Sequence, residues 1–217
     1  MCRIPMEKDE SFRILCPACS EGELRVTSEE MEIPHFGSVL ISTIKCSSCG
    51  FRSVDVIPVE TRPPSRYIAR IDDEKDLMLR VIRSGTGILR IPEFGLRISP
   101  GTVQEGYISN VEGVLERITG ILEQIRNDLT NYPEEFPDSP IRLENTNKLI
   151  ERISDIREGR FPEDSGITLI LEDPMGNSAI VNEEGGGGVE KELLGEKEVI
   201  DLTREIHSDF DEKLKED

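Results

Sequence analysis

The chain has 217 residues, of which 32% are charged and 36% hydrophobic, and its formal net charge is −18. So acidic a surface repels phosphate backbones and anionic lipid headgroups, which argues against nucleic-acid and membrane-surface binding. The opening MCRIPMEKDE is short and charged, unlike a secretory signal, and we find no apolar run long enough to span a membrane. We therefore expect a cytoplasmic protein.

Two Cys-x-x-Cys pairs, Cys16 with Cys19 and Cys46 with Cys49, contain four of the five cysteines. This spacing lets both sulfurs of a pair face one point, and two pairs complete the tetrahedral four-thiolate site typical of structural zinc. Disulfides would suit a secreted chain, and a thioredoxin-like redox motif needs a single pair in a βαβ context. We predict one structural Zn²⁺ ion with no open coordination position for catalysis.

Alternating apolar residues between the two cysteine pairs predict two strands, with the bend at IPHFG, residues 33–37. His35 in this bend is interpreted as a loop residue, since four sulfurs already satisfy a metal. Residues 1–62 are thus predicted to form a four-cysteine zinc ribbon. Pro34, His35 and Phe36 are candidate partner-binding residues, with Phe36 as an exposed anchor beside a rigid proline.

Residues 63–183 are expected to form a β-rich domain that a helical hairpin interrupts at about 110–159. Between residues 67 and 98, apolar residues alternate with arginine, the pattern of half-buried antiparallel strands. Helical spacing follows, with Ser109 as the predicted N-cap and Glu112 three residues on, and a second helix runs up to Gly159. An extended run at 167–173 and a short strand at 178–181 complete the domain.

Two features of this domain have both a structural and a functional interpretation. Four arginines recur along its strands, and pairing with nearby acids is favoured over a binding patch; they are Arg80, Arg83, Arg90 and Arg97. The second feature is a turn at 173–177. It is interpreted either as a tight turn that needs glycine and asparagine for backbone reasons or as a partner-binding site. Its candidate residues are Asp173, Pro174, Gly176 and Asn177.

Residues 184–217 are predicted to be a glycine linker followed by an acidic helical tail. From Glu183 onward the chain has 13 acidic and 5 basic residues. One apolar stripe recurs at helical spacing, formed by Val199, Leu202, Ile206 and Phe210. The stripe predicts a helix that docks either on its own domain or on a partner, and leaves that choice open.

Several stretches, in one order over residues 12–182, resemble the ZPR-type zinc-finger proteins. They are CPAC and CSSCGFRS with IPHF between them, DLMLRVIRS, GILRIPEFGLRI, NVEGVL and ITLILEDPMGNSAI. The chain carries one such unit, similar to the archaeal form, whereas eukaryotic members carry two in tandem. The resemblance implies a mainly β fold, in which a zinc ribbon precedes a double-stranded β-helix (jelly-roll-like) domain with an inserted helical hairpin.

The same resemblance implies an adapter or folding factor for translation elongation factor one alpha, whose basic patches an acidic protein would complement. A nucleic-acid-binding zinc ribbon in transcription or translation is the alternative, which the net charge opposes. No enzyme is expected, because the two histidines are His35 and His207, both outside the β domain, and glycines 185–188 lack the lysine and hydroxyl of a phosphate loop.

Overall fold

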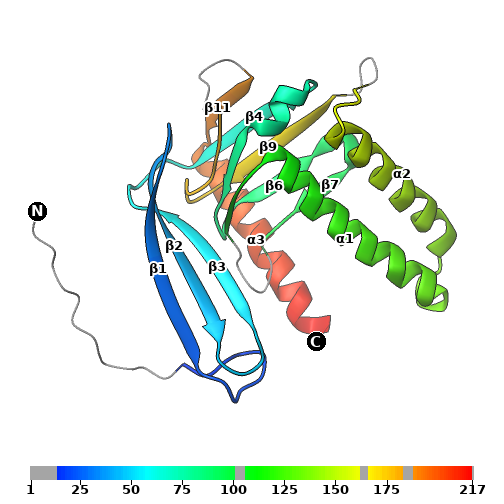
Figure 1. Cartoon of the computed structure of the whole chain (residues 1–217), viewed down its shortest axis with the longest axis horizontal. Coiled ribbons are helices and arrows are strands. Elements are labelled where there is room, and N and C mark those ends of the chain that lie inside the picture. The colour runs from blue at the N-terminus through cyan, green and yellow to red at the C-terminus, as the bar shows by residue number, and fades with distance from the viewer. Residues whose placement is uncertain (1–13, 101–105, 162–165, 183–187, 217) are drawn as a thin grey trace, which may run out of the picture.

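The computed structural model describes residues 14–100, 106–161, 166–182 and 188–216, with side chains described up to Ser208. Its first unit is a three-stranded antiparallel sheet in the order β1 (Leu24–Ile33), β2 (Gly37–Cys46) and β3 (Arg52–Pro58). The β1–β2 register pairs Leu24 with Cys46 at one end and Ile33 with Gly37 at the other. Figure 1 shows this ribbon as a long hairpin on one side of the molecule.

Two further antiparallel sheets enclose the main core. One has five strands in the order β11 (Val189–Leu193), β4 (Ser65–Ile71), β9 (Ile167–Asp173), β6 (Ile88–Ile91) and β7 (Leu96–Ile98). The other has the order β10 (Ala179–Val181), β5 (Arg80–Arg83) and β8 (Tyr107–Asn110). Alternate residues point into the core, as with the buried Ile167, Leu169 and Leu171 of β9. Short 3₁₀ helices lie at Glu74–Met78, Pro92–Phe94 and Pro133–Glu135.

A helical hairpin is inserted between β8 and β9, which confirms the expected mainly β fold with a helical insertion. Its helices α1 (Val111–Asn131) and α2 (Ser139–Arg157) lie side by side and extend away from the sheets (Figure 1). The predicted N-cap is wrong by one residue: α1 begins at Val111, and Asn110 Oδ1 accepts from the Gly113 N–H at 2.9 Å. Glu112 pairs with Arg157 of α2 at 2.6 Å instead of closing a capping box.

The two sheets around the main core form the second unit, and the carboxyl-terminal strand and helix pack on it, which answers the question that the sequence left open. Residues 184–187 of the predicted glycine linker lie outside the described residues. β11 adds to the edge of the five-stranded sheet by pairing with β4. Helix α3 (Glu196–Glu216) then crosses the outer face of that sheet, where Leu194 and Leu202 are buried against Ile88. Val199 and Ile206 pack on the same cluster, so the apolar stripe docks on its own domain. The side chain of Phe210 lies beyond those described.

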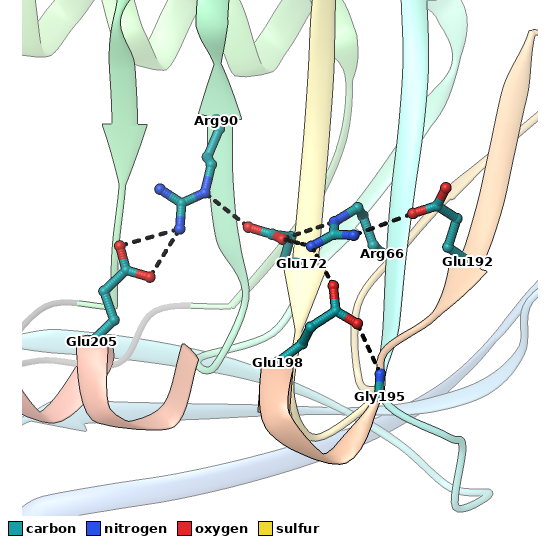
Figure 2. A network of polar contacts seen from close by, with 7 residues as sticks. All are labelled: Arg66, Arg90, Glu172, Glu192, Gly195, Glu198 and Glu205. Carbon is teal, nitrogen blue, oxygen red and sulfur yellow. Dashed lines mark hydrogen bonds and ion pairs between the residues drawn. The ribbon is translucent and has the colours of Figure 1, made fainter. Parts of the chain in front are cut away.

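Ion pairs hold α3 on the sheet. At their centre is Glu172, a β9 carboxylate that is only 5% exposed. Figure 2 shows Glu172 between two guanidinium groups, accepting from Nε of Arg66 and Nε of Arg90, each at 2.8 Å. Both arginines also reach acids of α3: Arg66 bonds Glu198 at 3.1 Å and Arg90 bonds Glu205 at 2.9 Å. The Gly195 N–H and then Arg66 lower the pKa of Glu198, so its carboxylate stays charged at the start of the helix.

This network settles the interpretation of two of the strand arginines. Arg90 and Arg97 both contact Glu205, with Arg97 Nε at 2.8 Å from the carboxylate. Acid pairing within the chain, rather than a ligand-binding patch, accounts for them. None of the helices within the described ranges is both long and apolar enough to cross a membrane.

The ribbon joins the second unit through a shared core at the bend end of its sheet. Ile33, Val39 and Val56 belong to the same buried cluster as the core between the two sheets of the second unit, which together are called the β-sandwich. Phe36 belongs there too: it is 2% exposed, and the Arg62 guanidinium lies 3.9 Å from its ring centroid. The expectation of an exposed Phe36 anchor is therefore wrong, because the bend folds back onto the chain that leaves the ribbon. Pro34 and His35 are exposed, with His35 at a φ of 62°.

We predict that Glu172→Gln lowers the free energy of unfolding by about 1–3 kcal/mol, between the values for exposed and for buried ion pairs. The charge that both guanidinium groups share would be lost, and α3 would be held less firmly. Urea denaturation followed by circular dichroism measures this. Asp201→Asn, at an exposed pair on α3, is the control and should change stability by less than about 0.5 kcal/mol. Equal effects of the two substitutions would contradict the role of Glu172.

We also predict that Phe36→Ala destabilises the protein by about 3–5 kcal/mol, the usual loss for a buried aromatic side chain. Thermal denaturation of the metal-loaded protein tests this. The neighbouring exposed substitution Pro34→Ala is the comparison, since it removes no buried contact. A Phe36→Ala variant as stable as the parent would mean that the bend does not anchor the ribbon.

Candidate metal centre

The four predicted cysteine ligands come together at the end of the ribbon sheet opposite the bend. Their ligand atoms all lie within 4.8 Å of one another. The Sγ atoms of Cys16 and Cys49 are 3.7 Å apart, and those of Cys19 and Cys46 are 3.8 Å apart. A tetrahedral ion with Zn–S bonds of about 2.3 Å requires sulfur separations of about 3.8 Å. The four cysteines are therefore arranged to bind a metal ion and fit zinc.

Backbone N–H groups around the sulfurs favour the thiolate form that a metal requires. Gly22 N–H points at the Cys19 sulfur at 3.4 Å, and the amides of Ser48 and Cys49 point at Cys46 at 3.3 and 3.5 Å. Hydrogen bonds from the backbone of Glu21 and Gly22 lower the pKa of Cys19 to about 6. The amides at Cys49 and Ser48 likewise lower the pKa of Cys46.

The pKa of Cys49 reflects the repulsion among four sulfurs that lie close together. The Phe51 backbone favours its thiolate, but burial and the three neighbouring sulfurs raise the pKa of Cys49 to about 12. Four negative charges so close together repel one another, and a divalent cation removes that repulsion. The donor set thus matches a soft-ligand metal in chemistry as well as in geometry.

Tight local packing explains the sequence around the cysteines. A Cβ atom on Gly22 would lie 2.4 Å from the Cys46 sulfur, so only glycine fits at this position. Gly50, which follows the second pair, has a φ of +77°, a conformation that favours glycine. His35 lies at the far end of β1 and β2, about 30 Å away for nine residues of strand. It is therefore not a ligand of this site.

The second predicted partner site, at 173–177, is a buried turn. Asp173 is fully buried and accepts from the hydroxyls of Ser84 at 2.7 Å, Thr86 at 2.8 Å and Ser178 at 2.5 Å. The Gly176 N–H donates to the Asp173 carbonyl at 3.1 Å. With Asp173, Pro174 and Gly176 all buried, this turn presents little surface for a partner.

Close approach of the backbone explains the glycine and the sequence signature of this turn. Gly176 has a φ of +73°, and a Cβ there would lie 2.5 Å from the Arg62 carbonyl oxygen and 2.6 Å from that of Pro63. The turn therefore supports the segment that connects the ribbon to β4. Asn177 is half-buried, and Met175, which is not among the predicted partner-binding residues, is the exposed residue of the turn.

We predict that Cys16→Ser abolishes stable metal binding and unfolds the ribbon, since metal binding in sites of this kind contributes on the order of 10 kcal/mol. Metal analysis by mass spectrometry and circular dichroism measure the two effects. Cys2→Ser, which changes the cysteine outside the described residues, should leave the metal content unchanged. Full metal occupancy in Cys16→Ser would overturn the four-thiolate assignment.

Two family models match the chain, the ZPR1 zinc-finger domain over residues 10–62 and the ZPR1 jelly-roll domain over residues 75–193. An uncharacterized ZPR1-like protein of Methanocaldococcus jannaschii is 41% identical over 202 residues, covering 89% of this chain and 90% of that protein. A second such protein, of Pyrococcus horikoshii, is 36% identical over 91% of this chain and 84% of its own length.

A eukaryotic relative, the zinc finger chaperone zpr1 of Schizosaccharomyces pombe, is 30% identical over 79% of this chain but only 36% of its own length. Both matched domains correspond to units of the structure, the ribbon with its four cysteines and the β-sandwich with its helical hairpin. The chain therefore belongs to the ZPR1 family of zinc-finger proteins.

Proposed function

We propose that this protein is a non-enzymatic adapter or folding factor, with translation elongation factor one alpha as its partner and the cytoplasm as its site of action. The observation that supports this most is the pairing of a ZPR1 zinc finger with a ZPR1 jelly-roll domain, together with the similarity to a relative named a zinc finger chaperone. The choice of elongation factor rests on the resemblance of the sequence to ZPR-type proteins.

One structural Zn²⁺ ion is part of this proposal. Four thiolates fill a tetrahedral coordination shell, so the ion has no open position for water or substrate. Its role is to hold the end of the ribbon that has few buried side chains: there, besides the cysteines, most residues are exposed or half-buried. The metal thereby sets the shape of a binding module rather than a reaction centre.

The helical hairpin offers apolar surface to a partner. Three large apolar side chains on it are half or more exposed: Ile121, Tyr132 and Ile141. Residues of this size on a protruding element, supported by a well-packed inner face, are features of protein-binding sites. Acidic charge over the remaining surface would complement a basic partner and increase the rate of encounter.

We expect the zinc-loaded protein to co-elute with its own organism's elongation factor one alpha in size-exclusion chromatography at low salt. The complex should weaken as salt screens the charges. A variant with Ile121→Ser and Ile141→Ser, which alters exposed side chains only, should bind about tenfold more weakly while its melting temperature stays unchanged. No complex with either the folded factor or its chemically unfolded form would contradict the proposal.

A further inference from the structure

A cleft with a volume of about 640 Å³ lies between the ribbon sheet and the second unit. One wall is a face of the ribbon, including Ile41 of β2 and Val54 of β3, and the other includes Ile108 of β8 and Arg117 of α1. The two walls are joined where the Gly106 N–H donates to the Val54 carbonyl at 2.7 Å. The cleft is therefore built from both family modules and exists only when they are joined.

Arg52, which lines this cleft, belongs to a row of three basic residues across the ribbon sheet. The register places Arg25 of β1 opposite Lys45 of β2, and Lys45 opposite Arg52 of β3. Directly opposite residues share a face and lie about 5 Å apart, so three like charges in one row are mutually destabilising. All three side chains are exposed, and none forms an ion pair with another described residue.

A fourth cation faces this row from the other wall. Arg117 lies over the ring of Tyr107, 4.8 Å from its centroid, and it too has no carboxylate partner among the residues that the structure describes. This differs from arginines elsewhere in the protein, since Arg66, Arg90 and Arg157 each contact two or more acids. In a chain of net charge −18, two cations that line one cleft without an ion pair to a described residue, Arg52 and Arg117, need an explanation.

Compensation of the metal centre does not explain the row. Successive side chains of a strand point to opposite faces, so Lys45 points away from the face that carries the Cys46 sulfur. Nor does the face supply its own counter-charge. Among the strand residues described on this face, the one carboxylate is Glu29, which lies four residues and about 13 Å along β1 from Arg25.

We propose that this cleft binds an acidic segment of a partner protein, with an apolar side chain of the segment between Ile41, Val54 and Ile108. Its carboxylates then contact Arg52, Arg117 and the rest of the basic row. Val54 and Arg52 are two residues apart on one face, about 7 Å, so the preferred segment is extended and has an acid two positions from an apolar residue. The inference deepens the proposed function and rests on it, since the client supplies this segment.

Polypeptide fits this cleft better than nucleic acid does. An apolar wall contributes nothing to a phosphate backbone, and the acidic surface around the cleft repels a longer polyanion. A short acidic segment meets only the local cations, and its apolar residue gains from burial in the cleft. Binding of either anion would weaken with salt, so the experiment has to compare their affinities directly.

The test is fluorescence anisotropy of the zinc-loaded full chain with a fluorescein-labelled peptide of Leu-Ser-Glu-Ser repeats. We expect binding that weakens with salt, and at least about tenfold weaker binding by the double variant Arg52→Gln, Arg117→Gln. The double variant Lys148→Gln, Arg204→Gln is the matched control: it removes two charges from exposed sites on α2 and α3 and should bind as the parent does. A Leu-Ser-Lys-Ser peptide should not bind.

Three other outcomes of the binding experiment would overturn the inference. Equal loss in both double variants would mean a response to net charge alone, and unchanged binding in Arg52→Gln, Arg117→Gln would place the peptide elsewhere. A single-stranded oligonucleotide that binds more tightly than the peptide, with the same variant dependence, would assign the cleft to nucleic acid. If the peptide binds but no complex with the elongation factor forms, the proposed partner alone is refuted. If the complex forms, also with the Arg52→Gln, Arg117→Gln variant, but the peptide does not bind, the proposed role of the cleft alone is refuted.

Discussion

The ribbon of this protein is held in two ways, by buried side chains at one end of its sheet and by four cysteines at the other. The defined shape of the ribbon depends on both. At the bend, Phe36 lies beneath the Arg62 guanidinium within the core of the β-sandwich. At the far end the four cysteines leave little apolar surface to bury, so cohesion there depends on a metal. A sheet held at two ends in two different ways keeps a defined face toward its neighbour, and the cleft between the units follows from that constraint.

A second constraint is the distribution of charge. Acids predominate over the whole chain, yet those at the carboxyl terminus are not simply a solvated tail. Glu198 and Glu205 lie on α3 over Arg66 and Arg90, which also share the buried Glu172 (Figure 2). Since each arginine faces several acids, the network tolerates the low dielectric of a helix–sheet interface better than an isolated pair would. The acidic helix thereby becomes part of the domain.

Local patterns in the sequence predicted local features well. β9 spans the run 167–173 as expected, α1 carries its buried residues at helical spacing, and the two Cys-x-x-Cys pairs meet at one point. These features depend on period and spacing, which a chain shows directly. The Ser109 cap was wrong by one residue because Asn110 is an equally good cap and directly precedes Val111, where the helix begins.

What the sequence did not show is which surface is covered by a distant segment. The Pro-His-Phe sequence predicts an exposed bend, but in the structure Arg62 lies over the Phe36 ring. The DPMGN signature suggests a site, but Asp173 is buried and accepts from the hydroxyls of Ser84 and Thr86, in a distant segment, and of Ser178, directly after the turn. The same limit hid the basic row, because Arg25, Lys45 and Arg52 lie on three different strands and become neighbours only through strand register. Net charge describes the average field of a protein, whereas a partner responds to the local one. The strongly acidic composition argues against the binding of long polyanions, and it would make the cations of the cleft, Arg52 and Arg117, selective for a short acidic segment.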